Sequence, residues 1–158
     1  MLLRCWRAGS NVALEPLGYD TAMSTENKSL VKRWFEEVWN KGSARAIDEL
    51  LAPDVRLYGL GEPMIGPAAF KPFHTAYRAA FPDIGICIED VVAEGDMVAV
   101  RWSAAGTHSA ATLGFDATNK RATFDGMSIV RVRNGQIVEG WNVFDQLGMM
   151  KQLGVVKT

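Results

Sequence analysis

Two carboxylic acids and one amide lie close together near the C-terminal end of the chain, in the stretch RNGQIVEGWNVFD at residues 133–145. Glu139 and Asp145 belong to a residue type that commonly acts as a general acid or base. Asn142 has no proton to exchange near neutral pH and only donates and accepts hydrogen bonds. Which of these side chains faces a cavity therefore decides between acid–base chemistry and binding.

The residues on either side of Asn134-Gly135 predict a hairpin, because this dipeptide favours a tight turn. A two-residue turn, with Arg133 opposite Gln136, mixes charged and apolar side chains on both sheet faces. A three-residue loop with Gly135 in a bulge, and Val132 opposite Gln136, separates them. We therefore predict the three-residue loop.

In this register Asn142 faces inward beside small residues, and Glu139 faces outward. The inward face carries Phe124, Gly126, Ser128, Val130, Val132, Val138, Gly140, Asn142 and Phe144. The outward face carries Asp125, Met127, Ile129, Arg131, Arg133, Ile137, Glu139 and Trp141. A packed core would need bulk at the small inward positions, so we predict a cavity with an amide and a hydroxyl in its wall. The alternative is that the glycines only bend the sheet and that Asn142 binds backbone groups.

Helices precede these strands. Apolar residues recur at helical spacing over 26–41, and Ser43 is placed to cap a second helix. A third helix is expected over about 66–81, with Pro67 in its first turn. A short helix follows Asp145, which we expect to cap it.

Strands are expected at 54–60, at 84–108 around a turn at 94–96, and at 122–144 around the hairpin. Helices followed by strands predict an α+β fold, in which one curved antiparallel sheet wraps around the N-terminal helices. The stretch MSTENKS begins at Met23, with Ser24 and Thr25 placed to cap the first helix. We take residues 1–22 as an N-terminal extension and 23–158 as a single domain.

Composition narrows the function. The 158 residues are 48% hydrophobic and 22% charged, with a net charge of −1. No basic excess is present to neutralise phosphates, so nucleic acid is not an expected partner, and the apolar runs are too short to span a membrane. Cys5 and Cys87 form no paired motif, which indicates a reducing cytoplasm. No His/Cys cluster has metal-ligand spacing, so no metal is expected.

Several short motifs in the right order resemble a known family. They are WFEEVWNKGSARAIDELLAPDV at 34–55, FPD at 81–83, GTH at 106–108, NKR at 119–121, VRVRNGQIVEGW at 130–141 and FDQLGMMKQLG at 144–154. From about Asn27 to Gly154 the chain resembles the SnoaL-like polyketide cyclases, also called ester cyclases. The resemblance implies a conical α+β barrel, as in ketosteroid isomerase and the nuclear transport factor, with a pocket between helices and sheet.

The resemblance also implies an activity and the residues that perform it, and this chain has other residues at those positions. Those cyclases close a polyketide ring by aldol condensation without a metal or organic cofactor, using an inward aspartate near the end of the last strand. Counted from the shared turn and the shared QLG, that position falls on Asn142, a histidine position on Ser128 and a glutamine position on Gly126. Asparagine cannot replace a general base, so acid–base chemistry would need another group.

Other residues have alternative interpretations. His74, on the third helix, is expected at the surface or the pocket rim, whereas for His108 the rim and a structural bond at a strand end stay open. Tyr58 and Trp102 are aromatic core or pocket wall. An epoxide hydrolase site would need carboxylates around an arginine, and Arg101 points outward by alternation.

We favour an enzyme related to the SnoaL-like cyclases, or a related isomerase or hydrolase, acting without cofactor on a small hydrophobic or polyketide-like molecule. The alternatives are a non-catalytic binding protein on the same fold and an epoxide hydrolase-like enzyme. No catalytic residue is identified. The expected substrate-binding residues are Asn142, Ser128, Gly126, Phe124, Phe144, Trp102, Tyr58 and His108. The outward apolar residues predict a homodimer through the outer sheet face, built on Met127, Ile129, Ile137 and Trp141.

Overall fold

Helices form most of the first half of the described chain and strands most of the second half, as the sequence predicts. The structure is a computed structural model that describes residues 21–59 and 61–156, so the predicted extension lies almost wholly outside the described residues. The elements are α1 (Thr21–Arg33), η1 (Trp34–Asn40), α2 (Ala44–Leu50), β1 (Leu51–Tyr58), β2 (Met64–Ile65), α3 (Gly66–Ala80), β3 (Gly85–Glu94), β4 (Met97–Thr107), β5 (Arg121–Arg133), β6 (Gln136–Phe144) and α4 (Gln146–Leu153).

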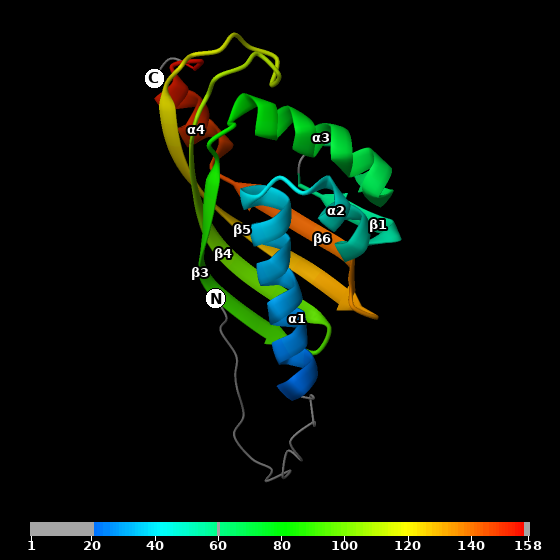
Figure 1. Cartoon of the computed structure of the whole chain (residues 1–158). Coiled ribbons are helices and arrows are strands. Elements are labelled where there is room, and N and C mark those ends of the chain that lie inside the picture. The colour runs from blue at the N-terminus through cyan, green and yellow to red at the C-terminus, as the bar shows by residue number, and fades with distance from the viewer. Residues whose placement is uncertain (1–20, 60, 157–158) are drawn as a thin grey trace, which may run out of the picture.

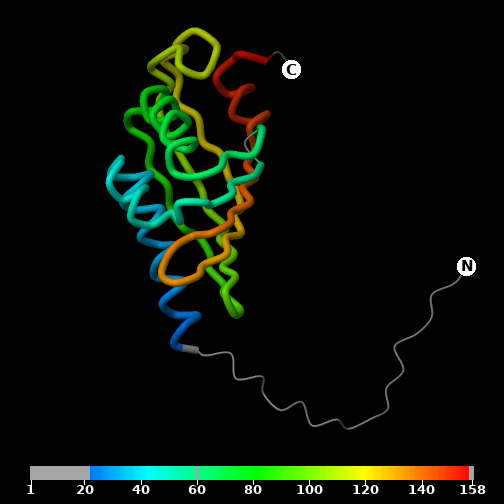
Figure 2. Tube along the Cα trace, turned by 90° about the vertical axis from the view of Figure 1, so that its right-hand side faces the viewer, coloured from blue at the N-terminus to red at the C-terminus, as the bar shows by residue number. Residues whose placement is uncertain are grey.

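The strands form one curved, open sheet in the order β2-β1-β6-β5-β4-β3, and α1 to α3 lie against its concave face (Figure 1). Figure 2 shows the helices and the sheet as two layers, with α4 at the end opposite the start of α1. The α+β prediction is confirmed. The sheet is mixed rather than wholly antiparallel, because β1 runs parallel to β6. No hairpin joins these two strands, so no tight turn forces them to run in opposite directions.

The first helix begins earlier than predicted and changes its winding. Ser24 and Thr25 lie inside α1 and do not cap it, and the Ser29 hydroxyl donates to the Thr25 carbonyl at 3.0 Å as in a helix interior. From Trp34 the chain continues as the π-helix η1, a wider form that often marks a functional site. The predicted cap of α2 is present: Ser43 accepts from the Ala46 N–H at 3.2 Å. Asp145 likewise caps α4.

The predicted three-residue loop of the last hairpin is wrong. Arg133 pairs with Gln136, and Asn134 and Gly135 both have positive φ, at 50° and 72°, as a two-residue turn requires. A bulge then places the extra residue Val138 inside the strand, between the pairs Val132–Ile137 and Arg131–Glu139.

Turn and bulge together shift the pairing by two residues from the predicted register. Because side chains alternate with a period of two, this shift leaves Asn142, Ser128 and Glu139 on their predicted faces. Ile137 lies on the bulge's other side and is only 1% exposed, so its predicted outward position is wrong.

Three side chains hold η1 in place. The Asn40 amide donates to the Ile86 carbonyl at 3.0 Å and accepts from the Ile86 N–H at 2.8 Å, which joins η1 to the edge strand β3. From α3, Arg78 donates to the Trp39 carbonyl at 3.0 Å and His74 Nε2 contacts the Val38 carbonyl at 2.8 Å.

The predicted surface position of His74 is therefore wrong. The side chain is 4% exposed and fills the space between α3 and η1. Burial lowers the pKa of His74, and the bond to the Val38 carbonyl opposes this shift. The imidazole thus serves as a neutral donor to η1.

No helix in the described part of the chain is both long and apolar enough to span a membrane.

Replacing Asn40 with Ala should lower the free energy of unfolding by about 1–2 kcal/mol, because both backbone groups of Ile86 lose their side-chain partner. Urea denaturation measures the change. The matched control is Glu36→Ala, which removes an exposed partner of Asn40 but no backbone contact and should change stability little. Equal effects of the two substitutions would contradict this role for Asn40.

Candidate functional site

A cavity of about 90 Å³ lies between the helices and the concave face of the sheet. Aromatic side chains form most of its helical wall, and their ring centroids lie 4.8–6.4 Å from those of their neighbours. Six aromatic residues form this wall, and they fall in two separate parts of the sequence because three lie on η1 and three on α3. They are Trp34, Phe35, Trp39, Phe70, Phe73 and Tyr77.

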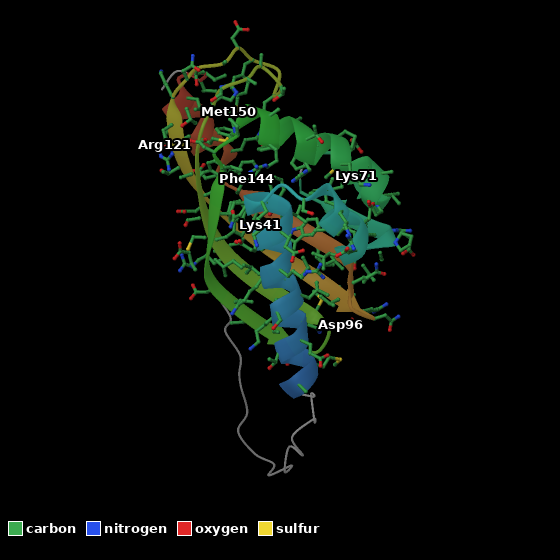
Figure 3. All side chains as sticks on the ribbon, viewed as in Figure 1. Lys41, Lys71, Asp96, Arg121, Phe144 and Met150 are labelled. Carbon is green, nitrogen blue, oxygen red and sulfur yellow. The ribbon has the colours of Figure 1, made fainter. Side chains whose placement is uncertain are left out.

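Most of the predicted site residues lie in the wall on the sheet side. Phe124, Ser128, Asn142, Phe144, Trp102 and Tyr58 line the cavity, whereas Gly126 and His108 do not. Figure 3 labels Phe144 at the end of β6, and its ring lies 6.3 Å from that of Tyr77 on α3. Six of the nine residues predicted to face inward thus line the cavity, together with Ile137 and Trp141, which were predicted to face outward.

The lining residues carry no carboxylate, imidazole, ammonium or guanidinium group. Glu139 faces outward and pairs with Arg131 at 3.4 Å, and Asp145 caps α4, so neither acid of the hairpin reaches the cavity. Arg101 also lies outside and pairs with Asp90 at 2.7 Å. The polar groups that remain in the wall are hydroxyls, indoles and the amide of Asn142.

A chain of hydrogen bonds crosses the sheet to this amide. The Trp102 Nε1–H donates to Ser128 Oγ at 3.0 Å, and Ser128 Oγ lies 2.6 Å from Asn142 Oδ1. Indole nitrogen only donates, so the Ser128 hydroxyl accepts there and has its own hydrogen to place. A separation of 2.6 Å is typical of an O–H···O bond and short for N–H···O. Ser128 therefore donates to Asn142 Oδ1.

Because Ser128 donates to the amide oxygen, the amide nitrogen of Asn142 is the last group in this series of hydrogen bonds. Among the described residues no protein group accepts a hydrogen bond from Asn142 Nδ2. Asn142 is half-buried and lines the cavity, so its N–H groups are available to an acceptor there. The site can therefore orient and polarise an oxygen atom, but its lining has no group that takes up a proton near neutral pH.

Gly126 contributes by its lack of a side chain rather than by leaving open space. It pairs with Trp102 across β4 and β5, and a Cβ atom at this position would overlap the indole ring. The expectation of empty volume at Gly126 is wrong, because Trp102 fills it. With the indole lying against the glycine, its N–H comes within reach of Ser128.

His108 is fully buried away from the cavity. Its Nδ1 accepts from the Thr118 N–H at 3.2 Å, and its ring lies 4.8 Å from that of Phe115. Of the two alternatives for His108, the structure thus agrees with the bond at the strand end. Tyr58 stacks on the outward-facing Trp141 at 5.9 Å and lies at the cavity's edge.

Sequence reasoning placed Tyr77 among the apolar positions of the third helix and gave its hydroxyl no role in the site. This residue of α3 lines the cavity, and burial raises the pKa of its hydroxyl to about 12. The available signal was a tyrosine on a helical face whose other large residues, Phe70 and Phe73, carry no polar group.

Comparisons with known proteins bear on both family and fold. The sequence pattern of the family described as SnoaL-like polyketide cyclase matches residues 29–153. A search of curated protein sequences gave no significant match. Among solved structures, IdmH from Streptomyces antibioticus, described as a candidate polyketide cyclase, is 30% identical with a TM-score of 0.71, over 81% of this chain and 98% of that one.

Two further structures share the fold at lower identity. A candidate SnoaL-like polyketide cyclase from Jannaschia sp. CCS1 is 22% identical with a TM-score of 0.79, over 85% of this chain and 96% of that one. A LEH-like epoxide hydrolase from M. tuberculosis is 17% identical with a TM-score of 0.66, over 84% of this chain and 92% of that one. The same framework thus occurs in proteins described as having different activities.

Replacing Gly126 with Ala should lower the free energy of unfolding by about 1–3 kcal/mol, because the new methyl group displaces the Trp102 indole. Chemical denaturation followed by tryptophan fluorescence measures this. The control is Gly85→Ala in β3, where nothing lies within 4 Å of the added Cβ and the change should be below about 0.5 kcal/mol. If Gly126→Ala is as stable as the control, the indole does not depend on the glycine.

Proposed function

The chain belongs to the SnoaL-like polyketide cyclase family, and we propose that it binds a small, largely apolar or polyketide-like carbonyl compound in its cavity without a cofactor. In this proposal Asn142 holds the carbonyl oxygen by hydrogen bonds instead of exchanging a proton. The observation that carries the proposal is the directed chain from Trp102 through Ser128, which leaves the Asn142 N–H groups for a ligand.

Such a site supports those steps of a ring closure that need no protein base. The aromatic walls hold a flexible substrate in a reactive conformation, which lowers the entropic part of the barrier. The amide donor stabilises negative charge that develops on the carbonyl oxygen. Removal of the proton from carbon would fall to solvent or to the substrate's own groups, because the lining has no carboxylate or imidazole.

A non-catalytic binding protein is the second candidate, and the same absence of a base in the lining favours it. Turnover of any polyketide-like ketone by the protein would decide against this candidate. The epoxide hydrolase alternative has less support, because Arg101 and its partner Asp90 lie outside the cavity.

The size of the cavity limits the ligand. A volume of about 90 Å³ is well below the roughly 300 Å³ of common ligand pockets. We therefore expect one- or two-ring compounds as first ligands, while larger polyketides would need the aromatic wall to move.

Asn142→Leu tests the proposal, because leucine has a similar volume and no hydrogen-bond donor. Binding of 1-indanone should weaken about tenfold, the loss of one hydrogen bond of about 1.4 kcal/mol. Binding of indane, the same skeleton without oxygen, should change little. Isothermal titration calorimetry measures both. Failure of 1-indanone to bind the unaltered protein, or equal losses for both compounds, would refute the proposed function.

Asn142→Asp is the complementary change, since it places a carboxylate where the family resemblance puts one. Burial in an apolar cavity raises the pKa of a carboxyl group, so this variant should show pH-dependent binding of 1-indanone. Binding by the unaltered protein should be flat from about pH 6 to 9, because neither the amide, the hydroxyl nor the indole of the chain titrates there.

We also propose a homodimer through the outer sheet face. Met127, Ile129, Trp141 and Val143 form an exposed apolar patch on β5 and β6, with Met127 57% and Val143 63% exposed. A patch of this kind on a sheet face favours association. The predicted contribution of Ile137 is withdrawn because that residue is buried. A small hydrophobic ligand and a second copy are thus the proposed partners, and a cytoplasmic location stays a prediction.

Light scattering at micromolar concentration should show a dimer, and Ile129→Lys should convert it to a monomer by placing a charge in the patch. Leu147→Lys, on an exposed position of α4, is the control and should stay dimeric. A monomeric unaltered protein would contradict the proposed interface.

A further inference from the structure

We propose that Tyr77 is the second hydrogen-bond donor of this site, and that Tyr77 and Asn142 together hold one carbonyl oxygen of the ligand. The inference rests on the proposed function and assigns a role to a residue on the opposite, helical wall of the cavity. It also predicts a preference for ketones over the corresponding alcohols.

The position of Tyr77 supports this role. Its ring lies edge-on to that of Phe144, with centroids 6.3 Å apart at an angle of 84°. Phe144 and Asn142 are two residues apart on β6 and both line the cavity, so they are neighbours on one face of the strand. Tyr77 therefore contacts Phe144, the neighbour of Asn142 on this face, in the wall of the same cavity.

The hydroxyl of Tyr77 has no other assigned task. Among residues 21–59 and 61–156, no protein group forms a hydrogen bond with it. Burial is the sole cause of its raised pKa of about 12, so the phenol stays protonated and remains a donor throughout the physiological range. A half-buried hydroxyl without a protein partner gains most from an acceptor inside the cavity.

The directions of the bonds determine which ligand oxygen fits. A carbonyl oxygen has two lone pairs and no hydrogen, so it can accept from both Tyr77 and Asn142. An alcohol must also place its own hydrogen. Asn142 Oδ1 already accepts from Ser128 at 2.6 Å, so a ligand hydroxyl would have to donate to the second lone pair of Oδ1 or to the Tyr77 oxygen, whereas a ketone has no hydrogen to place. The site therefore favours an acceptor that carries no donor.

A hydroxyl outside the cavity lining provides the control. Ser103 on β4 donates to the Glu89 carboxylate at 2.6 Å and is not among the lining residues. Ser103→Ala removes one hydroxyl, as Tyr77→Phe does, and the phenylalanine keeps the ring contacts of Tyr77. Only the change at Tyr77 should alter binding of a ketone.

The experiment titrates 1-indanone, 1-indanol and indane into the full chain and into the variants Tyr77→Phe and Ser103→Ala. Tyr77→Phe should weaken 1-indanone about tenfold, equivalent to about 1.4 kcal/mol, and leave indane unchanged. Ser103→Ala should leave all three affinities within about twofold. The unaltered protein should bind 1-indanone more tightly than 1-indanol, and Tyr77→Phe should reduce this preference.

The outcomes separate this inference from the proposed function. If 1-indanone binds and depends on Asn142 but not on Tyr77, the role of Tyr77 is refuted and the proposed function stands. If Tyr77→Phe weakens indane as much as 1-indanone, the tyrosine contributes packing alone and the inference is also refuted. If 1-indanone does not bind the unaltered protein, both fail. Melting temperatures of the variants confirm that each one is folded before titration.

Discussion

The contact between the Trp102 indole and Gly126 is the interaction on which the site depends. Because Gly126 has no side chain, the indole lies against β5 and its N–H reaches Ser128. That bond occupies the Ser128 oxygen and turns the hydroxyl hydrogen toward Asn142 Oδ1. The amide oxygen of Asn142 is thereby held by Ser128, which leaves the amide N–H groups for a ligand. Each side chain in this series orients the next, so a substitution at one position should also change the orientation of the side chain that follows it.

The departures from the family pattern are consistent with one another. Positions at which the resemblance implies an aspartate, a histidine and a glutamine are here Asn142, Ser128 and Gly126. A carboxylate among aromatic walls would need a partner to offset its loss of hydration, whereas a neutral amide costs less to bury. The Ser128 hydroxyl donates to Asn142 Oδ1 at 2.6 Å, and the missing side chain at Gly126 leaves room for the Trp102 indole, which donates to Ser128. In the proposed function, hydrogen bonding by these residues takes the place of proton transfer.

Alternation along the strands was sufficient to place Asn142 and Ser128 on the inward face, because a shift of two residues preserves every face. Alternation could not reveal that the turn has two residues and that a bulge follows it. Each of these features shifts the strand pairing by one residue, and two such shifts return Asn142 to the same face. The burial of His74 depends on the Val38 carbonyl, which the π-helix presents, and apolar spacing does not distinguish a π-helix from an α-helix. Tyr77 was placed among the apolar positions of its helix with Phe70 and Phe73, because spacing reports the ring and not the hydroxyl.

The two walls of the cavity are held by different means, and this difference affects what a ligand can change. On the sheet side, Asn142 is oriented by the ladder partner Ser128 and by Trp102, which is 5% exposed. On the helical side, Asn40 and His74 hold the backbone of η1, while the aromatic rings contact one another by their edges and faces. Contacts between rings depend less steeply on geometry than hydrogen bonds do, so the rings adjust more readily. We therefore expect a ligand larger than the cavity to move the aromatic wall, while the amide keeps its direction.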